Sequence, residues 1–166
     1  MQTTYTHYFT TPLGTMEIKA TDAFVTAVNF VEEGFDKLSL TNDIPAIVTQ
    51  CQTELEEYFA GTRTQFTVPV QPEGTSFQTE VWQALQHIAY GETLSYTDIA
   101  LQLGKDYKAS RAVGLANGKN PVAVIIPCHR VIGENGKLTG YAGGAWRKEW
   151  LLNHEGKVSG KRLSLF

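Results

Sequence analysis

The stretch IPCHRV holds two residues, Cys128 and His129, of the types that nucleophilic catalysis uses. A thiol attacks only as its thiolate, which is a small fraction at neutral pH, so it needs a base or a positive environment nearby. Side chains of successive residues in an extended chain point to opposite faces. The two side chains can therefore touch only where the chain turns, and a proton relay through one water is the easier geometry. Glu155, at the end of the last predicted helix, is a candidate to orient the imidazole.

The same residue types also have structural interpretations. His129 could be a hydrogen-bonded core histidine, and Glu155 an exposed charge at a helix end. Cys51, the second of only two cysteines, lies on the apolar face of a predicted helix, which indicates packing. Two cysteines cannot form a four-sulfur zinc site, and none of the four histidines has ligand spacing to them. We therefore expect no metal and no cofactor.

The N-terminal part of the chain predicts an antiparallel sheet with one helix. TYTHYF, TMEIKA and FVTAVNF alternate as strands and are separated by turn-forming TPLG and TDA. A helix follows, from Pro45 to a stop at Gly61, and TQFTVPV predicts one more short strand. The apolar face of that helix is formed by Ile44, Ile47, Val48, Cys51, Leu55, Tyr58 and Phe59.

The C-terminal part is predicted to be helical. Thr75 and Gln78 have capping-box spacing, which places a domain boundary near residue 74, between domains 1–74 and 75–166. The inner face of the helix that begins there is assigned to Phe77, Val81, Leu85 and Ile88. SYTDIALQLG and KASRAVGLANG then predict a helix-turn-helix, a pattern also found in pairs of helices that bind nothing. An NG turn follows Cys128, and a last helix with Trp146, Trp150, Leu151 and His154 inward is expected to stop at Gly156.

Charge is divided unevenly between these two parts. Residues 1–74 hold three basic and ten acidic residues, a net −7, and residues 75–166 hold eleven and seven, a net +4, which together give −3. A basic half favours a polyanion such as nucleic acid, although a solvated surface has the same composition. There is neither an apolar run long enough for a membrane span nor a signal-peptide layout at the N-terminus. We expect a cytoplasmic protein without a membrane partner.

NPVAVIIPCHRVIGENGKLTGYAGGAWRKEWLLNHEG closely resembles the signature of the methylated-DNA–protein-cysteine methyltransferases, the O6-alkylguanine repair family. GETLSYTDIA and SRAVGLANGKNP resemble the helices that precede that signature. The resemblance implies an α+β fold with an N-terminal ribonuclease-H-like sheet and helix and a C-terminal winged helix-turn-helix domain. It also implies a monomeric DNA-repair transferase that acts on double-stranded DNA with alkylated bases. The alkyl group of O6-alkylguanine, and also of O4-alkylthymine, would pass irreversibly to Cys128 in a single turnover.

The resemblance assigns roles to residues of this chain. Cys128 would accept the alkyl group, His129 would act as base through water, Glu155 would orient His129, and Asn120 would stabilise the cysteine loop. The substrate pocket would be formed by Tyr96, Val131, Tyr141, Ala142 and Gly143. Contacts to a duplex with the damaged base flipped out would come from Tyr96, Ser110, Arg111, Ala112 and Gly114, with Arg111 filling the gap.

Two departures and two alternatives accompany this prediction. Some relatives hold an N-terminal zinc ion, for which this chain lacks the cysteines, and others have serine where Ala142 stands, so the pocket is expected to admit bulkier alkyl groups. A non-enzymatic DNA-binding lesion sensor or regulator is the first alternative, but related sensors lack the cysteine at the position of Cys128. A cysteine hydrolase that regenerates its thiol is the second, and more than one product per molecule would identify it.

Overall fold

The computed structural model describes residues 3–32, 43–138 and 140–161. The chain divides into two compact units. The first contains residues 1–73 together with 121–125, and the second contains residues 74–120 and 126–166. The short segment that precedes Cys128 therefore packs with the first unit, although the cysteine itself belongs to the second.

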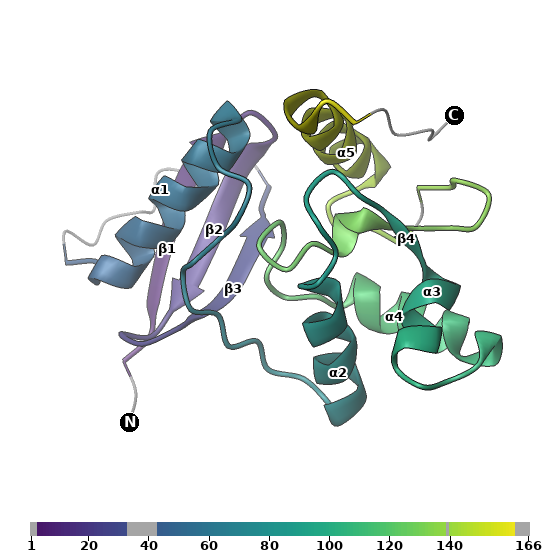
Figure 1. Ribbon diagram of the computed structural model, residues 1–166. Helices are drawn as coiled ribbons and strands as arrows, with labels where there is room; N and C mark the ends of the chain where they lie inside the picture. The colour runs from purple at the N-terminus through teal and green to yellow at the C-terminus, as the bar shows by residue number, and fades with distance from the viewer. Residues whose placement is uncertain (1–2, 33–42, 139, 162–166) are drawn as a thin grey trace. The chain divides into compact units, whose positions relative to one another are not determined.

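Three antiparallel strands form the sheet of the first unit, as the alternating sequence predicts. They are β1 (Tyr5–Thr11), β2 (Gly14–Ala20) and β3 (Val25–Phe30), in the order β1-β2-β3 (Figure 1). In β2, Met16, Ile18 and Ala20 are buried, which is every second residue, because successive side chains leave a strand on opposite faces.

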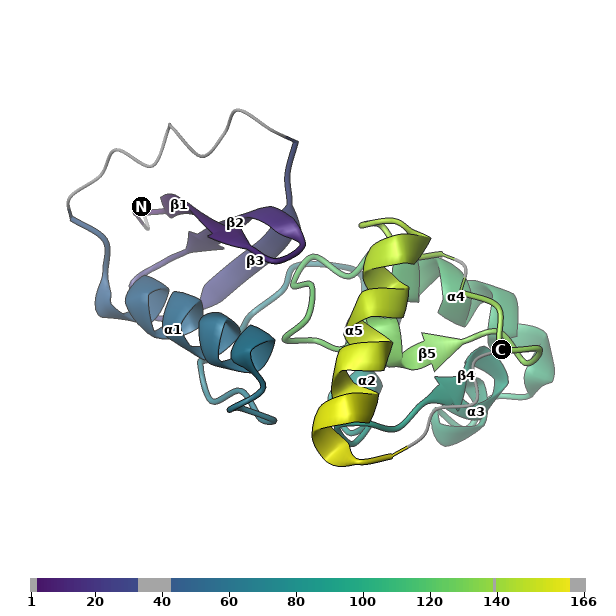
Figure 2. The same ribbon diagram turned by 90° about the horizontal axis from the view of Figure 1, so that it is seen from above.

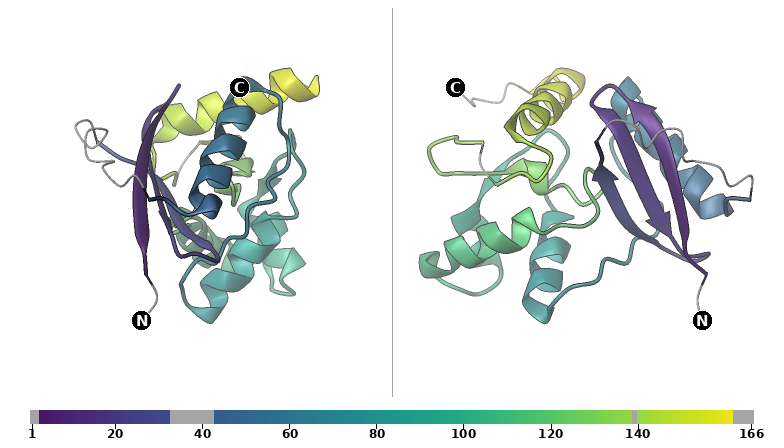
Figure 3. Two further views of the ribbon diagram at one scale, coloured as in Figure 1. Left: turned by 90° about the vertical axis from the view of Figure 1, so that its left-hand side faces the viewer. Right: turned by 180° about the vertical axis from the view of Figure 1, so that it is seen from behind.

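One helix, α1 (Ala46–Ala60), covers one face of this sheet (Figures 2 and 3). Pro45 is its N-cap and Gly61 ends it in the left-handed conformation, with φ 82°, so both predicted boundaries are confirmed. Cys51 is fully buried on the face towards the core. Burial raises the pKa of the Cys51 thiol to about 12, so this cysteine stays protonated and is suited to packing.

The strand predicted for TQFTVPV is wrong. Only Val70 pairs there, through a single parallel bridge to Val25. The buried Glu54 carboxylate instead accepts hydrogen bonds from the backbone N–H groups of Thr67 at 2.8 Å and Val68 at 3.1 Å. These donors are thus not available to a strand ladder, and Pro69 has no N–H to contribute.

The segment Pro121–Ile125 extends the first unit beside β3. The Val28 N–H donates to the Pro121 carbonyl at 2.9 Å, and the Ala123 N–H donates to the Val28 carbonyl at 2.9 Å. Val124 then adopts φ 69°, and the Ile125 N–H donates to the Ala123 carbonyl at 2.8 Å. A β-branched residue rarely adopts a positive φ, so this is a sharp and strained turn three residues before Pro127.

The second unit begins with the predicted capping box. At the start of α2 (Ser76–Leu85), the Thr75 side chain accepts a hydrogen bond from the Gln78 N–H, and the Gln78 side chain accepts one from the Thr75 N–H. The buried residues of α2 are Val81, Trp82 and Leu85. Phe77, expected on the inner face, is only partly buried, and the Lys105 ammonium lies 5.7 Å from its ring centroid. Trp82, which the sequence did not assign to this face, is buried, and its indole N–H donates to the Ala116 carbonyl at 2.9 Å.

The predicted helix-turn-helix is present. Its helices are α3 (Tyr96–Gln102) and α4 (Ser110–Gly118), and a 3-10 turn, η2 (Tyr107–Ala109), leads into α4. Ser95 caps α3 and forms a second capping box with Asp98. Figure 1 shows α3 and α4 side by side. The predicted NG turn after Cys128 forms, because the Gly136 N–H donates to the Gly133 carbonyl at 2.8 Å and the Gly133 N–H donates to the Lys137 carbonyl at 3.1 Å. The strand before it, β5 (Val131–Ile132), pairs in parallel with β4 (Leu94–Ser95).

The last helix, α5 (Ala145–Ser159), differs from its prediction at both ends. Trp146 is 56% exposed, with the Arg147 guanidinium 4.4 Å from its ring centroid, and Gly156 continues the helix to Gly160. Its buried residues are Lys148, Leu151, Leu152 and Glu155. The inward face thus includes Leu151, as predicted, together with two charged residues that an apolar pattern does not indicate. No helix of the described residues is long and apolar enough to cross a membrane.

Candidate active site

The chain turns at Cys128, so the cysteine does not lie in an extended segment. Pro127 has φ −82° and ψ 63°, and the Cys128 N–H donates to the Ile126 carbonyl at 2.8 Å, the hydrogen bond of an inverse γ-turn. A 3-10 turn, η3 (Cys128–Arg130), follows directly. Cys128, His129 and Arg130 are all buried there, with the thiol-bearing residue 6% exposed. The sequence expectation that neighbouring side chains diverge here therefore does not apply.

Two asparagines fix the backbone on either side of Pro127. The Asn120 amide donates to the Ile126 carbonyl at 2.8 Å, and the Asn117 amide donates to the Cys128 carbonyl at 3.3 Å. Asn117 is 1% exposed, and its Oδ1 has no hydrogen-bond partner among the described residues. Both side chains come from α4 or the residues just after it, so this helix holds the cysteine turn in place.

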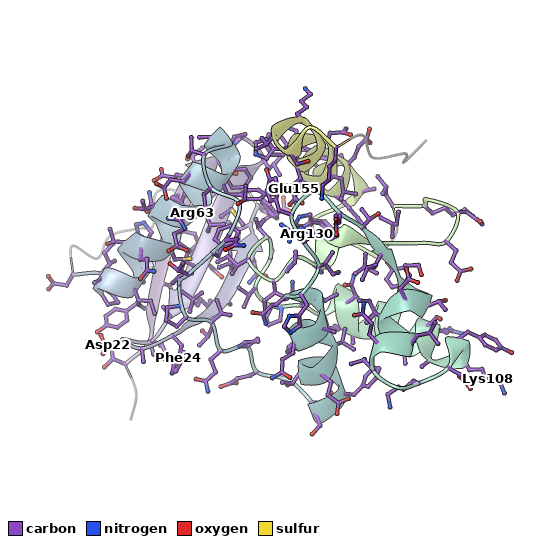
Figure 4. All side chains as sticks on the ribbon, in the orientation of Figure 1. Asp22, Phe24, Arg63, Lys108, Arg130 and Glu155 are labelled. Atoms are coloured by element: carbon purple, nitrogen blue, oxygen red, sulfur yellow. The ribbon has the colours of Figure 1, made fainter. Side chains whose placement is uncertain are left out.

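Glu155 is the centre of a buried ionic cluster. Its carboxylate lies 2.6 Å from His129 Nε2 and accepts hydrogen bonds from Arg130 Nε at 2.8 Å, Arg130 Nη2 at 3.1 Å and the Gly91 N–H at 3.1 Å. Glu155 and Arg130 are labelled in Figure 4. Burial alone would raise the pKa of Glu155, but His129 and Arg130 outweigh it and hold this pKa well below its usual range. The carboxylate is therefore ionised, and its two oxygens are fully used.

His129 is fully buried and neutral at rest. Burial lowers its pKa more than the Glu155 carboxylate raises it. Because an ionised carboxylate only accepts hydrogen bonds, the proton of the neutral ring sits on Nε2, facing Glu155. Nδ1 is then a lone-pair acceptor, and it has no hydrogen-bond partner among the residues that the structure describes. The arrangement leaves one basic nitrogen free to receive a proton.

The Cys128 thiol is protonated at rest. Burial raises its pKa, while a hydrogen bond from Asn120 and the positive charge of Lys148 oppose that rise. Lys148 on α5 has no exposed surface, donates to the Val131 carbonyl at 2.6 Å and has a pKa lowered by burial to about 8. The positive charge of Lys148 can therefore stabilise the thiolate that forms when the proton leaves.

The predicted pocket residues have differing environments. Val131 is fully buried in β5, and the Tyr141 hydroxyl is buried without a hydrogen-bond partner among the described residues. Burial, and after it the charge of Cys128, raise the pKa of Tyr141 well above its usual range, so its hydroxyl stays protonated. Ala142 is exposed, and the Gly143 carbonyl accepts a hydrogen bond from Arg147 at 2.9 Å.

The residues predicted to contact DNA gather at α4 and the start of α3. Arg111 and Ala112 are exposed on α4, while Ser110 and Gly114 are partly buried. A Cβ at Gly114 would lie 3.7 Å from the Tyr96 ring, and one at Gly140 would lie 3.5 Å from the Tyr96 hydroxyl. Tyr96 thus stands between the second helix and the loop that carries Tyr141. Within the described residues, no three His, Cys, Asp or Glu side chains lie close enough to hold a metal ion.

Comparison with known proteins decides the family. Residues 4–72 match the ribonuclease-like domain and residues 76–157 the DNA binding domain of 6-O-methylguanine DNA methyltransferase. The methylated-DNA–protein-cysteine methyltransferase of Methanosarcina acetivorans is 46% identical over 155 residues, which cover 92% of this chain and 98% of that protein. The chain belongs to the methylated-DNA–protein-cysteine methyltransferase family.

Solved structures agree with this membership. The Mycobacterium tuberculosis O6-methylguanine methyltransferase has a TM-score of 0.82 and 40% identity, covering 98% of this chain and 96% of its own. The Mycobacterium tuberculosis OGT in complex with DNA has a TM-score of 0.82 and 43% identity, covering 92% of this chain and 93% of its own. The family, the α+β fold and the methyltransferase class expected from the sequence are confirmed.

In this methyltransferase the sequence interpretation assigned no specific role to three buried residues of the site. Arg130, Asn117 and Lys148 are buried polar residues that contact Glu155, Cys128 and Val131 respectively. A signal existed for Lys148, because it precedes Leu151, Leu152 and Glu155 at helical spacing and so shares their face. No local signal marks Asn117, since its partner is fixed only when α4 packs on the cysteine turn.

Proposed function

We propose that this methyltransferase removes alkyl groups from guanine O6, and also from thymine O4, in duplex DNA by transferring them to Cys128. The observation that carries the proposal is the pairing of a buried thiol with an adjacent neutral imidazole whose Nδ1 is unoccupied. Glu155 fixes the tautomer that leaves this nitrogen basic. Such a site can convert the Cys128 thiol to the nucleophilic thiolate by accepting its proton on His129.

The transfer follows from these positions. The thiol proton passes through one water to His129 Nδ1, and the imidazolium is stabilised by the Glu155 carboxylate 2.6 Å from Nε2. The thiolate attacks the alkyl carbon, the new S–C bond forms, and the C–O bond breaks with its electrons going to the guanine. Tyr96, at the start of α3, donates a hydrogen bond to the departing base, which lowers the cost of its developing charge.

The reaction consumes the protein. Its product is a thioether at Cys128, which has no acyl carbon that water can attack, so hydrolysis cannot restore the thiol. Each molecule therefore acts once. The monomer meets duplex DNA through the C-terminal domain, residues 75–166, in the cytoplasm, where reducing conditions keep Cys128 as the free thiol that the structure contains.

The damaged base must leave the duplex to reach the thiol, because a stacked base is inaccessible and flipping it costs a few kcal/mol. Arg111 is exposed on α4, and its guanidinium can occupy the space that the base leaves. The small residues Ala112 and Gly114 beside it let the helix backbone approach the DNA. The pocket is lined by Tyr96, Val131, Tyr141, Ala142 and Gly143, and alanine at 142 leaves room for larger alkyl groups.

Intact-mass measurement after mixing with duplex DNA that contains O6-methylguanine tests this function. We expect the mass of one methyl group to be added per molecule, on the peptide that holds Cys128. The variant Cys128→Ala should take up none and still bind the duplex. Methylation of Cys51 would refute the proposal, and several turnovers per molecule would refute it in favour of a hydrolase. Binding by the wild-type protein without any transfer would favour the lesion sensor.

A further inference from the structure

The face of α4 that is exposed to solvent is formed by four residues at helical spacing. They are Arg111, Ala112 and Leu115 on the helix and Lys119, which is its C-cap. The opposite face of the helix is buried and consists of Val113, Ala116 and Asn117. A leucine side chain that is 66% exposed thus lies at the centre of the outer face, one turn from Arg111 and one turn from Lys119.

Single exposed leucines are common on protein surfaces, so exposure alone does not distinguish Leu115. Its neighbours do. Two cations flank it and the outer face of α4 carries no acidic residue. Leu101 on α3 provides a contrast within the same unit, since it is 58% exposed but lies three residues after the acidic Asp98.

A face with cations at its ends and an apolar centre is complementary to the minor groove of duplex DNA. The groove has a row of phosphates along each edge, and its walls are apolar deoxyribose. It is about 6 Å wide, whereas a helix with its side chains is about 10–12 Å across, so the groove must open before a helix can enter. Proteins that open it commonly insert an apolar side chain at a base step and partly unstack that step.

We infer that Leu115 is a DNA-contacting residue, an apolar wedge that holds the minor groove open one helical turn from Arg111. The inference rests on the proposed function, in which α4 enters duplex DNA. Arg111 fills the gap left by the flipped base, and Leu115 maintains the widened groove beside it. Lys119 contributes charge to the phosphate row at the other end of the face.

Equilibrium binding to a duplex containing O6-methylguanine tests this role, with all proteins carrying Cys128→Ala so that no transfer occurs. Leu115→Ala should weaken binding about tenfold, because part of a leucine side chain is withdrawn from water in the complex. Leu101→Ala removes the same atoms from a similarly exposed site and should change affinity by less than about twofold. Alanine favours helices, so neither variant disrupts its helix.

The salt dependence of binding separates the wedge from the cations. Leu115→Ala should leave the slope of log affinity against log salt unchanged, whereas Lys119→Ala should reduce it by about 0.9. Energy transfer between dyes at the two ends of the duplex should report a smaller bend with Leu115→Ala than with Leu101→Ala. Equal affinity losses for the two leucine variants, or an unchanged bend, would overturn the inference.

A failure of the inference can be distinguished from a failure of the proposed function. The wild-type protein is treated with the free base O6-methylguanine, and the mass of the Cys128 peptide is measured. Uptake of methyl by the wild type, together with equal behaviour of Leu115→Ala and Leu101→Ala in duplex binding, would refute the wedge alone. If the wild type takes up no methyl group from either free base or duplex, the proposed function fails, and the inference fails with it.

Discussion

Replacing Glu155 with glutamine keeps the shape of the side chain and removes its charge. The carboxylate has no exposed surface and faces His129, two nitrogens of Arg130 and the Gly91 N–H at 2.6–3.1 Å. Glutamine leaves the Arg130 guanidinium buried without its counter-charge and turns an N–H₂ group towards other donors. Removing one partner of a buried ion pair costs about 3–5 kcal/mol, a large part of a typical folding free energy of about 5–15 kcal/mol.

The matched control is Glu54→Gln in the first unit. Glu54 is also a buried carboxylate, but the donors that it accepts from are uncharged groups of Gln50, Thr67 and Val68. Glu54→Gln leaves no charged partner without its counter-charge. The loss of unfolding free energy should therefore stay near that of an unsatisfied hydrogen bond, about 1–3 kcal/mol. Urea unfolding midpoints of both variants and of the wild type measure the difference.

The two variants should differ more in alkyl transfer than in stability. Glu155 stabilises the protonated form of His129, so Glu155→Gln makes the imidazole a weaker base and slows methylation of Cys128. Glu54→Gln should transfer at the wild-type rate. If Glu155 acts through His129, a Glu155→Gln and His129→Ala double variant should lose little more rate than the slower single variant. Fully additive losses, or a Glu155→Gln protein that transfers normally, would refute this reasoning.

The stability difference should also depend on pH with a defined sign. The pKa of Glu155 is lowered in the folded protein, so its contribution is fully present above the unfolded value of about 4.3 and is lost as pH falls towards the folded value. Unfolding free energies of wild type and Glu155→Gln should therefore differ by a constant amount between about pH 6 and 8, and converge in more acid solution. A gap that widens below about pH 4 would contradict the assigned charge state.

Three further predictions concern other parts of the second unit. Arg111→Ala should slow repair of duplex DNA more than reaction with the free base, because the free base needs no flipping, and equal slowing would mean that Arg111 shapes the active site instead. Lys148→Met removes the buried cation that lowers the pKa of Cys128, so the rate at which iodoacetamide alkylates this thiol at about pH 7, where Lys148 is protonated, should fall; an unchanged rate would show that Lys148 acts only through its bond to Val131. Thr75→Ala removes the N-cap of α2 and should lower the free energy of unfolding by about 1 kcal/mol in urea titrations, whereas no change would mean that the cap is replaced by solvent.

Helix starts are the features that local sequence determined best. Thr75 and Ser95 each accept a hydrogen bond from the backbone three residues later, and the capping box of Thr75 and Gln78 forms as predicted. A cap joins atoms separated by only three residues, so its chemistry is contained in the sequence window. The strands β1–β3 were predictable for the same reason, since alternation expresses which face a strand buries.

Long-range competition explains the elements that sequence reasoning got wrong. TQFTVPV has the composition of a strand, but Glu54 on α1 takes two of its N–H groups. Trp146 was placed inside because it is aromatic, whereas Lys148 occupies the inward position on that helix. In each case the structure of the segment depends on a partner that is distant in sequence, and local composition does not indicate that partner.

The sequence alone determined which family the chain belongs to and which thiol we propose as the nucleophile, because thiol, imidazole and their neighbours form a contiguous and specific motif. Only the tertiary structure decided the protonation states. Glu155 lies 25 residues from Arg130 in sequence, yet the two share two hydrogen bonds in a site closed to solvent. Charges out of water respond to distance and burial, not to order along the chain, so the ionised carboxylate, the neutral imidazole and the buried Lys148 emerge only when α5 packs against the cysteine turn.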